Sequence, residues 1–192
     1  SPAGYNHHTV LLRGNRQGKP VEEARVVTSV GEICRSTEDY EVYSRLAEID
    51  SLQVILSNTT EAGISYEPTD RLEDCPPKSY PGKLTKFLYE RFQAVKGDRQ
   101  KGLLILPTEL IEQKGEKLSG YVRRYIESWG LSGEFLSWLE ESCIFCNTLV
   151  DRIVSGYPEK ERERLAKKLG YDDPFLTVGE PFALWVIEGR KE

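Results

Sequence analysis

Three short apolar runs, each of which stops abruptly at small polar or charged residues, constrain the fold of this chain more than any other feature. The runs occupy residues 54–56, 103–106 and 143–146, and helix-length segments separate them. Continuous apolar runs with this spacing are typical of parallel strands that are covered by helices on both faces. The pattern therefore predicts an α/β fold with a mostly parallel sheet and flanking helices.

Other segments predict the elements around this sheet. Residues 5–13 and 24–30 have strand character, and the turn-forming residues 14–18 lie between them, so a β-hairpin is expected near the start. A helix is predicted over residues 38–47, with Thr37 or Ser36 as its N-cap. Further helices are predicted from residue 79 and from Pro158; the first carries an apolar stripe at helical spacing: Leu84, Phe87, Leu88, Phe92 and Val95.

Composition and charge exclude several classes of function. The 192 residues are 39% hydrophobic and 30% charged, as in a globular domain, and the formal net charge is −5. Basic residues alternate with acidic ones and form no patch, so no nucleic-acid partner is expected. No apolar run approaches the roughly 20 residues that span a bilayer, so no membrane role is expected. Four scattered cysteines favour a reducing, cytoplasmic setting.

The polar residues that follow the first apolar run are candidates for ligand binding. In open α/β sheets the ligand lies beyond the carboxyl ends of the strands. Hydroxyl, amide and carboxylate groups follow the run, together with a glycine that allows close backbone approach: Asn58, Thr59, Thr60, Glu61 and Gly63. Such a loop suits a ribose or another ligand with many hydroxyls. A capped turn is the alternative, because Ser, Thr and Asn also satisfy their own backbone.

The polar residues that directly follow each apolar run are named polar stops. The stops after the second and third runs contain Glu109 and the pair Asp151 and Arg152. Glu109 could bind a hydroxyl group or cap the following helix. Asp151 and Arg152 could form part of a site or a structural salt bridge with each other. If the parallel-sheet prediction holds, Thr60, Glu109 and Asp151 are expected to converge on one crevice at one edge.

Cysteine and histidine give no support for metal or redox chemistry. Cys143 and Cys146 have the C-x-x-C spacing, but both fall in the apolar run rather than at a helix N-terminus, where a thiolate is stabilised. No second pair of ligands stands nearby, so no metal site is expected. The only histidines, His7 and His8, lie in the first predicted strand, away from the polar stops.

Two phosphate-binding motifs are missing from the chain. Neither G-x-G-x-x-G nor G-x-x-x-x-G-K-[ST] occurs. The sequence also contains no methionine, even at position 1, which suggests an excised piece of a longer protein; processing is the alternative.

Four segments carry a resemblance to a known family. They are SNTTEAGISY from Ser57, SYPGKLT from Ser79, PTELI from Pro107 and TLVDRIVSGYP from Thr148. In these segments the chain resembles the polyol-specific long-chain dehydrogenase/reductase family, which includes mannitol dehydrogenases and hexuronate reductases, and it is most similar to the hexuronate reductases. The resemblance extends from about Tyr5 to Arg190. The first and last segments are the specific ones.

The resemblance implies a two-domain, NAD-dependent enzyme that acts on a sugar acid. Residues 1–192 would be the later part of its N-terminal Rossmann-type domain, an incomplete NAD-binding domain. The family's glycine-rich start and its C-terminal helical catalytic domain, with the motif K-x-x-x-x-N-x-x-H, are not found here. No catalytic residue is therefore expected in this chain, its partner would be that C-terminal domain, and the chain alone is expected to be inactive.

The resemblance also assigns roles to the polar stops. Asn58, Thr59, Thr60, Glu61 and Gly63 would line the nicotinamide side of the cofactor site. Glu109, Asp151 and Arg152 would lie near the substrate. The family's substrate-binding Asn falls on Leu110, which cannot donate a hydrogen bond, and this argues mildly against the mannitol branch. Another branch of the family and a non-catalytic α/β binding module remain alternatives.

Overall fold

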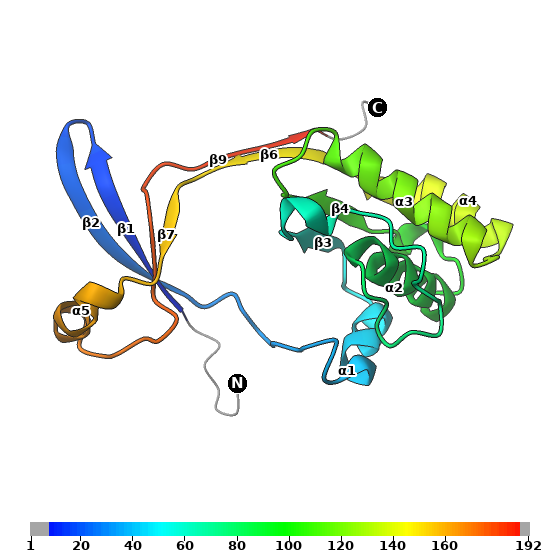
Figure 1. Ribbon diagram of the computed structural model, residues 1–192, viewed down its shortest axis with the longest axis horizontal. Helices are drawn as coiled ribbons and strands as arrows, with labels where there is room; N and C mark the ends of the chain where they lie inside the picture. The colour runs from blue at the N-terminus through cyan, green and yellow to red at the C-terminus, as the bar shows by residue number, and fades with distance from the viewer. Residues whose placement is uncertain (1–7, 189–192) are drawn as a thin grey trace. The chain divides into compact units, whose positions relative to one another are not determined.

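The computed structural model describes residues 8–188, except for the side chains of Arg16 and Glu61. It contains two compact units. Unit 1 comprises Ser1–Ile33 and Val150–Trp185, and unit 2 comprises Cys34–Leu149 and Val186–Glu192. Figure 1 shows the elements of both units.

Unit 2 contains the parallel sheet that the apolar runs predict. The strands β3 (Val54–Ser57), β4 (Leu104–Pro107) and β5 (Ile144–Phe145) pair in that order and are all parallel. The α/β fold with a parallel sheet is confirmed. The helices of unit 2 are α1 (Tyr40–Arg45), α2 (Tyr80–Ala94), α3 (Lys114–Ser128) and α4 (Gly133–Ser142).

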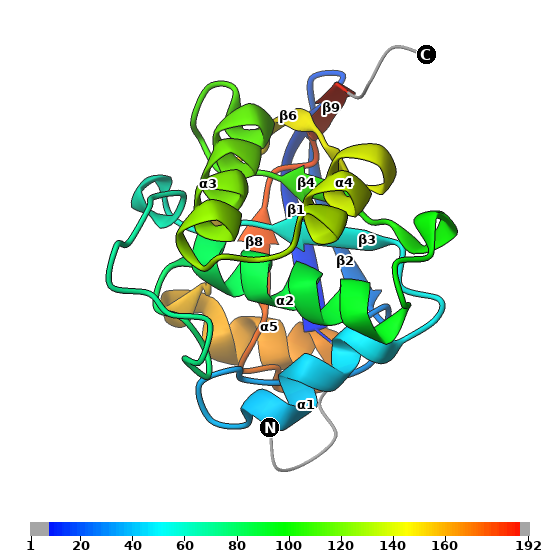
Figure 2. The same cartoon turned by 90° about the vertical axis from the view of Figure 1, so that its right-hand side faces the viewer.

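Helices α2, α3 and α4 cover one face of this sheet (Figure 2). The helix α2 connects β3 to β4, and α3 with α4 connects β4 to β5, so right-handed crossovers that progress in one direction place all three on the same side. The core between helices and sheet is apolar. It includes Leu84 and Leu88 of α2, Val122 of α3 and Ile105 of β4.

The opposite face of β3 is not covered within the described residues. Val54 and Leu56 are 44% and 53% exposed, whereas Ile55, which points to the other face, packs against the core. The prediction of strands buried on both faces is therefore wrong for β3. The apolar run predicted the strand correctly, but it did not predict that only one face of the strand is covered.

A buried arginine fastens the segment that precedes β3. Arg91 of α2 is fully buried, and its guanidinium donates to the carbonyl oxygens of Ala47 (2.9 Å), Ile49 (2.7 Å) and Leu52 (3.3 Å). These carbonyls follow α1, in and after a 3₁₀ turn (Leu46–Glu48), where no regular ladder satisfies them. The charge is thus dispersed over several backbone dipoles.

Asp70 organises the long loop between β3 and α2. Its carboxylate, 2% exposed, accepts hydrogen bonds from Lys78 N (2.7 Å), Ser79 Oγ (2.6 Å) and Tyr125 Oη (3.1 Å). Ser79 is in turn the N-cap of α2 and accepts from Gly82 N. Burial opposes the charge of Asp70, but these donors outweigh it and lower the pKa of its carboxyl group.

Unit 1 is built on the predicted hairpin. The strands β1 (His8–Arg16) and β2 (Lys19–Val27) are antiparallel, and the turn is only Gln17 and Gly18, both with positive φ (54° and 76°). Two-residue turns of this kind match the twist of the flanking strands. Both strands therefore extend into the segment predicted as turn. Residues 5–7 of the predicted strand lie outside the described residues.

The sheet of unit 1 is mixed. Its order is β2-β1-β8-β7, where β8 (Thr177–Gly179) is parallel to β1 and antiparallel to β7 (Val154–Gly156). The helix α5 (Arg162–Leu169) packs Leu165 against Leu11 and Val178. The remaining strands, β6 (Asn147–Asp151) and β9 (Leu184–Glu188), pair with each other, and the boundary between the units falls inside both.

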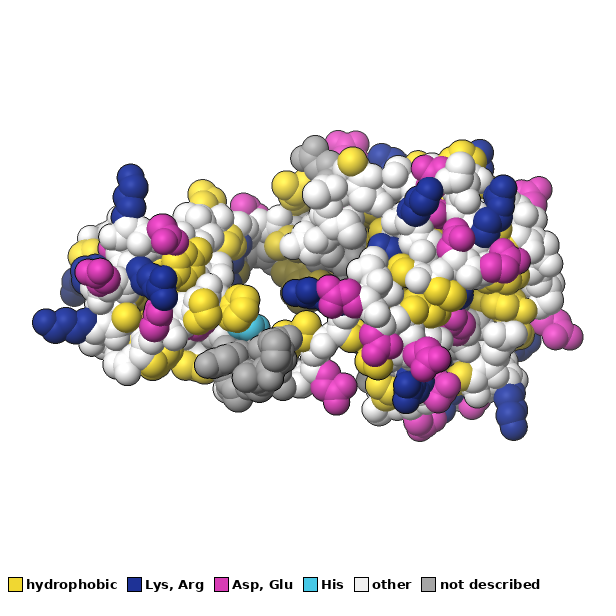
Figure 3. Space-filling view, turned by 60° about the horizontal axis from the view of Figure 1, so that its bottom comes forward, with side chains coloured by type: hydrophobic (Ala, Val, Ile, Leu, Met, Phe, Trp, Pro, Cys, Tyr) yellow, Lys and Arg dark blue, Asp and Glu magenta, His cyan; other side chains and the backbone are white. Residues whose placement is uncertain are grey.

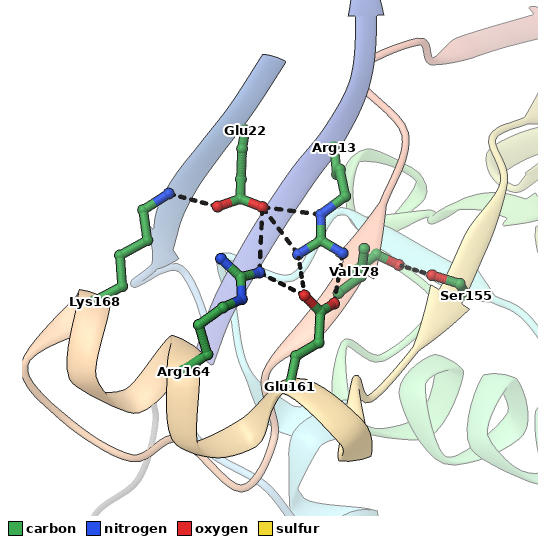
Figure 4. A network of polar contacts seen from close by, with 7 residues as sticks. All are labelled: Arg13, Glu22, Ser155, Glu161, Arg164, Lys168 and Val178. Atoms are coloured by element: carbon green, nitrogen blue, oxygen red, sulfur yellow. Dashed lines mark hydrogen bonds and ion pairs between the residues drawn. The ribbon is translucent and has the colours of Figure 1, made fainter. Parts of the chain in front are cut away.

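An ion-pair network ties α5 to the hairpin (Figure 4). Arg13 of β1 pairs with Glu22 of β2 (2.9 Å) and with Glu161 (2.6 Å). Arg164 and Lys168 of α5 also pair with Glu22. The hydrogen bond from Lys168, followed by those of the neighbouring cations, lowers the pKa of Glu22 to about 2. Every charge in this network is paired, so we interpret the network as a structural contact between α5 and the hairpin and not as a ligand site.

Candidate functional site

The carboxyl ends of β3 and β4 meet at one edge of the unit 2 sheet. The parallel register places Ser57 beside Pro107. Beyond them, Thr108 N and Thr108 Oγ1 both donate to the carbonyl oxygen of Ser57, at 2.8 and 2.7 Å. These bonds hold together the bases of two predicted polar stops, residues 58–63 and residues 108–109. The loops therefore leave the sheet from a common, fixed origin.

Glu109 joins the second of these segments to the first. Its side chain is 1% exposed, and its Oε1 accepts from Thr59 N and from Thr59 Oγ1, each at 3.0 Å. The two residues are 50 positions apart, so the contact depends on the parallel pairing of β3 and β4. The structure thus brings together Thr59 and Glu109, two of the residues singled out by the sequence.

The loop of residues 58–63 is compact as well as polar. Gly63 N donates to Thr60 O at 2.7 Å and closes a 3₁₀ turn (Glu61–Gly63). A Cβ atom on Gly63 would lie only 2.2 Å from Thr59 Oγ1, so only glycine fits against this threonine. Asn58 and Thr60 are exposed, and the side chain of Glu61 lies outside the described residues. The exposed groups are therefore the ones that a ligand can reach.

Two further polar side chains, those of Tyr80 and Lys114, lie close enough for the charge of Glu109 to affect their pKa values, and the sequence analysis assigned neither of them a role. The hydroxyls of Ser57 and Tyr80 are buried and make no hydrogen bond of normal geometry within the described residues, and Glu109 Oε2 is in the same situation. Burial, more than the charge of Glu109, raises the pKa of Tyr80. Lys114, at the start of α3, is 4% exposed; burial lowers its pKa, and the charge of Glu109 opposes that shift.

The signals for these residues in the sequence are weak. Tyr80 and Lys114 each begin a helix that follows a predicted strand, which is where a doubly wound fold places site residues. Nothing in either residue type distinguishes it from an ordinary helix-start residue.

Asp151 and Arg152 lie at and after the end of β6, in unit 1, and both are exposed. Arg152 Nε donates to Phe182 O at 3.0 Å, and among the described residues no ion pair joins Arg152 to Asp151. The salt-bridge alternative for this pair is therefore wrong. Because Asp151 belongs to unit 1 and Thr60 and Glu109 to unit 2, the convergence of all three remains a prediction.

The two cysteines with C-x-x-C spacing are free and buried, and neither lies in a strand. Cys143 follows α4 and Cys146 follows β5. Burial raises the pKa of Cys143 to about 11, which opposes thiolate chemistry. Within residues 8–188 no group of three or more His, Cys, Asp or Glu side chains is placed to hold a metal ion. His7 lies outside the described residues, and the ring of His8 packs edge-on against Phe175.

The charge distribution on the surface and the length of the helices also bear on function. Acidic and basic side chains are interspersed over the face that Figure 3 shows. None of the helices in the described part of the chain is both long enough and apolar enough to cross a membrane.

Comparison with known proteins identifies the family. The model of the mannitol dehydrogenase Rossmann domain matches residues 5–192. The chain belongs to the mannitol dehydrogenase family. This confirms the resemblance that the four sequence segments indicated.

Similar proteins and solved structures agree with this family. The chain is 47% identical over 182 residues to an altronate oxidoreductase of Bacillus subtilis (strain 168) and 46% identical over 183 residues to one of Klebsiella pneumoniae. Each alignment covers 95% of this chain but 38% of the relative, so the chain spans well under half the length of these relatives.

Two solved structures share the fold. The first is Pseudomonas fluorescens mannitol 2-dehydrogenase in a ternary complex with NAD and D-mannitol. Its TM-score is 0.76 at 18% identity, with 95% of this chain and 38% of that chain covered. The second is a substrate-free D-sorbitol dehydrogenase, with a TM-score of 0.73 at 20% identity and 94% and 38% of the chains covered.

Proposed function

We propose that this chain forms the nicotinamide side of an NAD-binding site and part of the substrate floor in an oxidoreductase of sugar acids. The whole protein would interconvert D-altronate and D-tagaturonate. The observation that carries the proposal is the loop of residues 58–63, held by Glu109 at the carboxyl edge of a parallel sheet in a chain of this family. The similarity to altronate oxidoreductases favours this branch over the mannitol branch.

The residues present fit one end of the dinucleotide. Asn58 and Thr60 expose an amide and a hydroxyl that suit a ribose or a carboxamide, and Gly63 lets the loop close tightly against Thr59. No glycine-rich phosphate cradle occurs in the sequence, so these residues fit the nicotinamide end and not the diphosphate. When bound, the nicotinamide would donate or accept the hydride. The loop would orient it through its fixed backbone.

We propose Asp151 and Arg152 for contact with the substrate, whereas Glu109, which the resemblance also assigned to the substrate, is 1% exposed and would support the site without facing the substrate. Arg152 is exposed, and a guanidinium can bind the carboxylate of a sugar acid through two parallel hydrogen bonds. Leu110, 71% exposed, occupies the position of the family's hydroxyl-binding Asn and offers no hydrogen bond. Specificity would then depend on charge rather than on an amide, which suits an acid better than a neutral polyol.

Several features complete the proposal. The general acid or base would lie in a C-terminal catalytic domain of the whole protein, for which residues 1–192 would supply the later part of the N-terminal domain. The cysteines are free thiols, which supports a reducing, cytoplasmic setting.

A substrate panel on the full-length protein tests the assignment. NADH oxidation is expected with D-tagaturonate and NAD reduction with D-altronate, both faster than with D-fructuronate, D-fructose or D-mannitol, and NADPH serves as the cofactor control. Absence of turnover with every hexuronate would contradict the proposal. If the complete reading frame also lacked both the glycine-rich and the lysine motifs, a non-catalytic binding module would replace it. The 192-residue chain alone is expected to show no turnover.

A further inference from the structure

One carboxylate oxygen of residue 109 makes two hydrogen bonds to the loop of residues 58–63. Glu109 Oε1 accepts two hydrogen bonds from a single residue, one from the main chain and one from the side chain of Thr59. We propose that Glu109 is a positioning residue that sets the conformation of this loop through Thr59, rather than a group that contacts the substrate. The inference rests on the proposed function only for the identity of the ligand that the loop receives.

Burial separates Glu109 from any ligand that binds at this edge of the sheet. The residue is 1% exposed, and its second oxygen, Oε2, is also shielded from solvent. Its neighbour Leu110 is 71% exposed, so the chain presents residue 110 to the solvent and turns residue 109 inward. A group that solvent does not reach cannot bind a substrate hydroxyl without a rearrangement of the loop.

The contact fixes more of the loop than Thr59 alone. Because Glu109 Oε1 accepts from both the backbone N–H and the Oγ1 of Thr59, it determines the backbone direction and the rotamer of that residue. The Thr59 side chain then forms the surface against which Gly63 packs, because a Cβ on Gly63 would fall within 2.5 Å of Thr59 Cβ. The position of Glu109 is therefore transmitted from β4 through Thr59 to the glycine at the end of the loop.

A buried amine lies near Glu109 within unit 2. Lys114 is buried near it, and the negative charge of Glu109 favours the protonated amine there against the effect of burial. A neutral side chain of the same size that keeps an acceptor, such as glutamine, preserves the grip on Thr59. An apolar leucine, which has no acceptor, removes it entirely. This difference provides the test.

The first experiment measures the loop without any cofactor. Amide hydrogen exchange is followed at residues 59–63 in the full-length protein and in its Glu109→Leu, Glu109→Gln and Thr59→Val variants. Glu112→Leu is the matched control, because Glu112 is an exposed glutamate on the same connection. Exchange of the Thr59 amide is expected to accelerate by about tenfold or more in Glu109→Leu. Glu109→Gln and Glu112→Leu should stay close to the parent, and unchanged exchange in Glu109→Leu would overturn the inference.

The second experiment separates positioning from substrate contact. In Glu109→Leu the Kd for NADH is expected to rise about tenfold, while the KM for the sugar acid at saturating NADH changes by less than about threefold. Thr59→Val should raise the Kd less, and adding it to Glu109→Leu should have little further effect, because both changes break the same link. A rise in substrate KM with unchanged NADH affinity would instead make Glu109 a substrate ligand. If the parent protein bound no nicotinamide dinucleotide, the proposed function would fail, whereas the exchange data would still decide the role of Glu109.

Discussion

Substitution of Gly63 by alanine gives the sharpest test of the geometry at the strand tips. The added Cβ would lie 2.2 Å from Thr59 Oγ1 and 2.5 Å from Thr59 Cβ. Because non-bonded carbon atoms settle near about 3.5 Å, Thr59 would have to move by about 1 Å. Its two 3.0 Å hydrogen bonds to Glu109 would then be stretched beyond bonding distance.

The magnitude follows from those two bonds. A hydrogen bond to a charged group contributes about 1.5–3 kcal/mol to stability, and the loss of both would also leave a buried carboxylate without partners. Partial relaxation of the loop and the lower chain entropy of alanine in the unfolded state offset about 1–2 kcal/mol. We expect Gly63→Ala to lower the free energy of unfolding by about 2–4 kcal/mol.

Urea unfolding followed by tryptophan fluorescence measures this change, since Trp129 and Trp138 both lie in unit 2. Gly120→Ala is the control: Gly120 is exposed on α3, nothing lies within 4 Å of an added Cβ, and alanine there should stabilise by about 0.5–1 kcal/mol. In a Thr59→Gly background the clash disappears, so Gly63→Ala should cost little. An equal cost in both backgrounds, or no cost in the parent, would refute the reasoning.

Four further predictions concern the rest of the molecule. Arg91→Met removes the donors from the carbonyls of Ala47, Ile49 and Leu52 and should destabilise unit 2 by at least about 3 kcal/mol in the same assay, whereas Lys117→Met, on the exposed side of α3, should change it by less than about 0.5 kcal/mol. Asp70→Asn should lower the free energy of unfolding by about 2 kcal/mol, because the carboxylate oxygen that accepts from Ser79 and Tyr125 is replaced by an NH₂ donor. An unchanged free energy of unfolding would show that the loop does not depend on Asp70. The Glu22 carboxyl group has a pKa lowered from 4.5 to about 2, so its contribution is complete above pH 4.5 and is lost as the pH falls towards 2. Because that carboxylate remains partly hydrated, the loss should be about 1 kcal/mol and should vanish in Glu22→Gln, as acid titration of unfolding can show. Finally, iodoacetamide should label the exposed Cys75 in the folded protein and reach Cys143 and Cys146 only after unfolding, which peptide mass spectrometry can read; early labelling of Cys143 would contradict its burial.

The sequence predicted the parts of this fold whose signal is local. Apolar runs located β3 and β4, and the stripe on α2 identified Leu84, Phe87 and Leu88 as core. Helix ends were predicted less well: Thr37 or Ser36 was expected to cap the first helix, but Asp39 does so, because its carboxylate reaches Val42 N. A hydroxyl and a carboxylate are equivalent caps, so residue type alone could not choose between them.

Contacts between segments that are distant in the sequence could not be predicted in this way. The polar stops were recognised from spacing, yet the pairing of Thr59 with Glu109 depends on the register of β3 against β4, which residue types do not report. The burial of Lys114 and of the Tyr80 hydroxyl depends likewise on how two helices meet the sheet. Only the structure distinguishes a glutamate that holds a loop from one that faces a ligand.

The chain passes between its two units three times, at residues 33–34, 149–150 and 185–186. In unit 1, Thr9 N donates to Asp173 Oδ2 across 164 positions, whereas most of unit 2 is one continuous stretch. Closing so long a loop is entropically costly until the intervening residues are already folded. During synthesis, therefore, the sheet that bears the Thr59 loop can assemble before β8, the strand that pairs with the hairpin in unit 1, has left the ribosome.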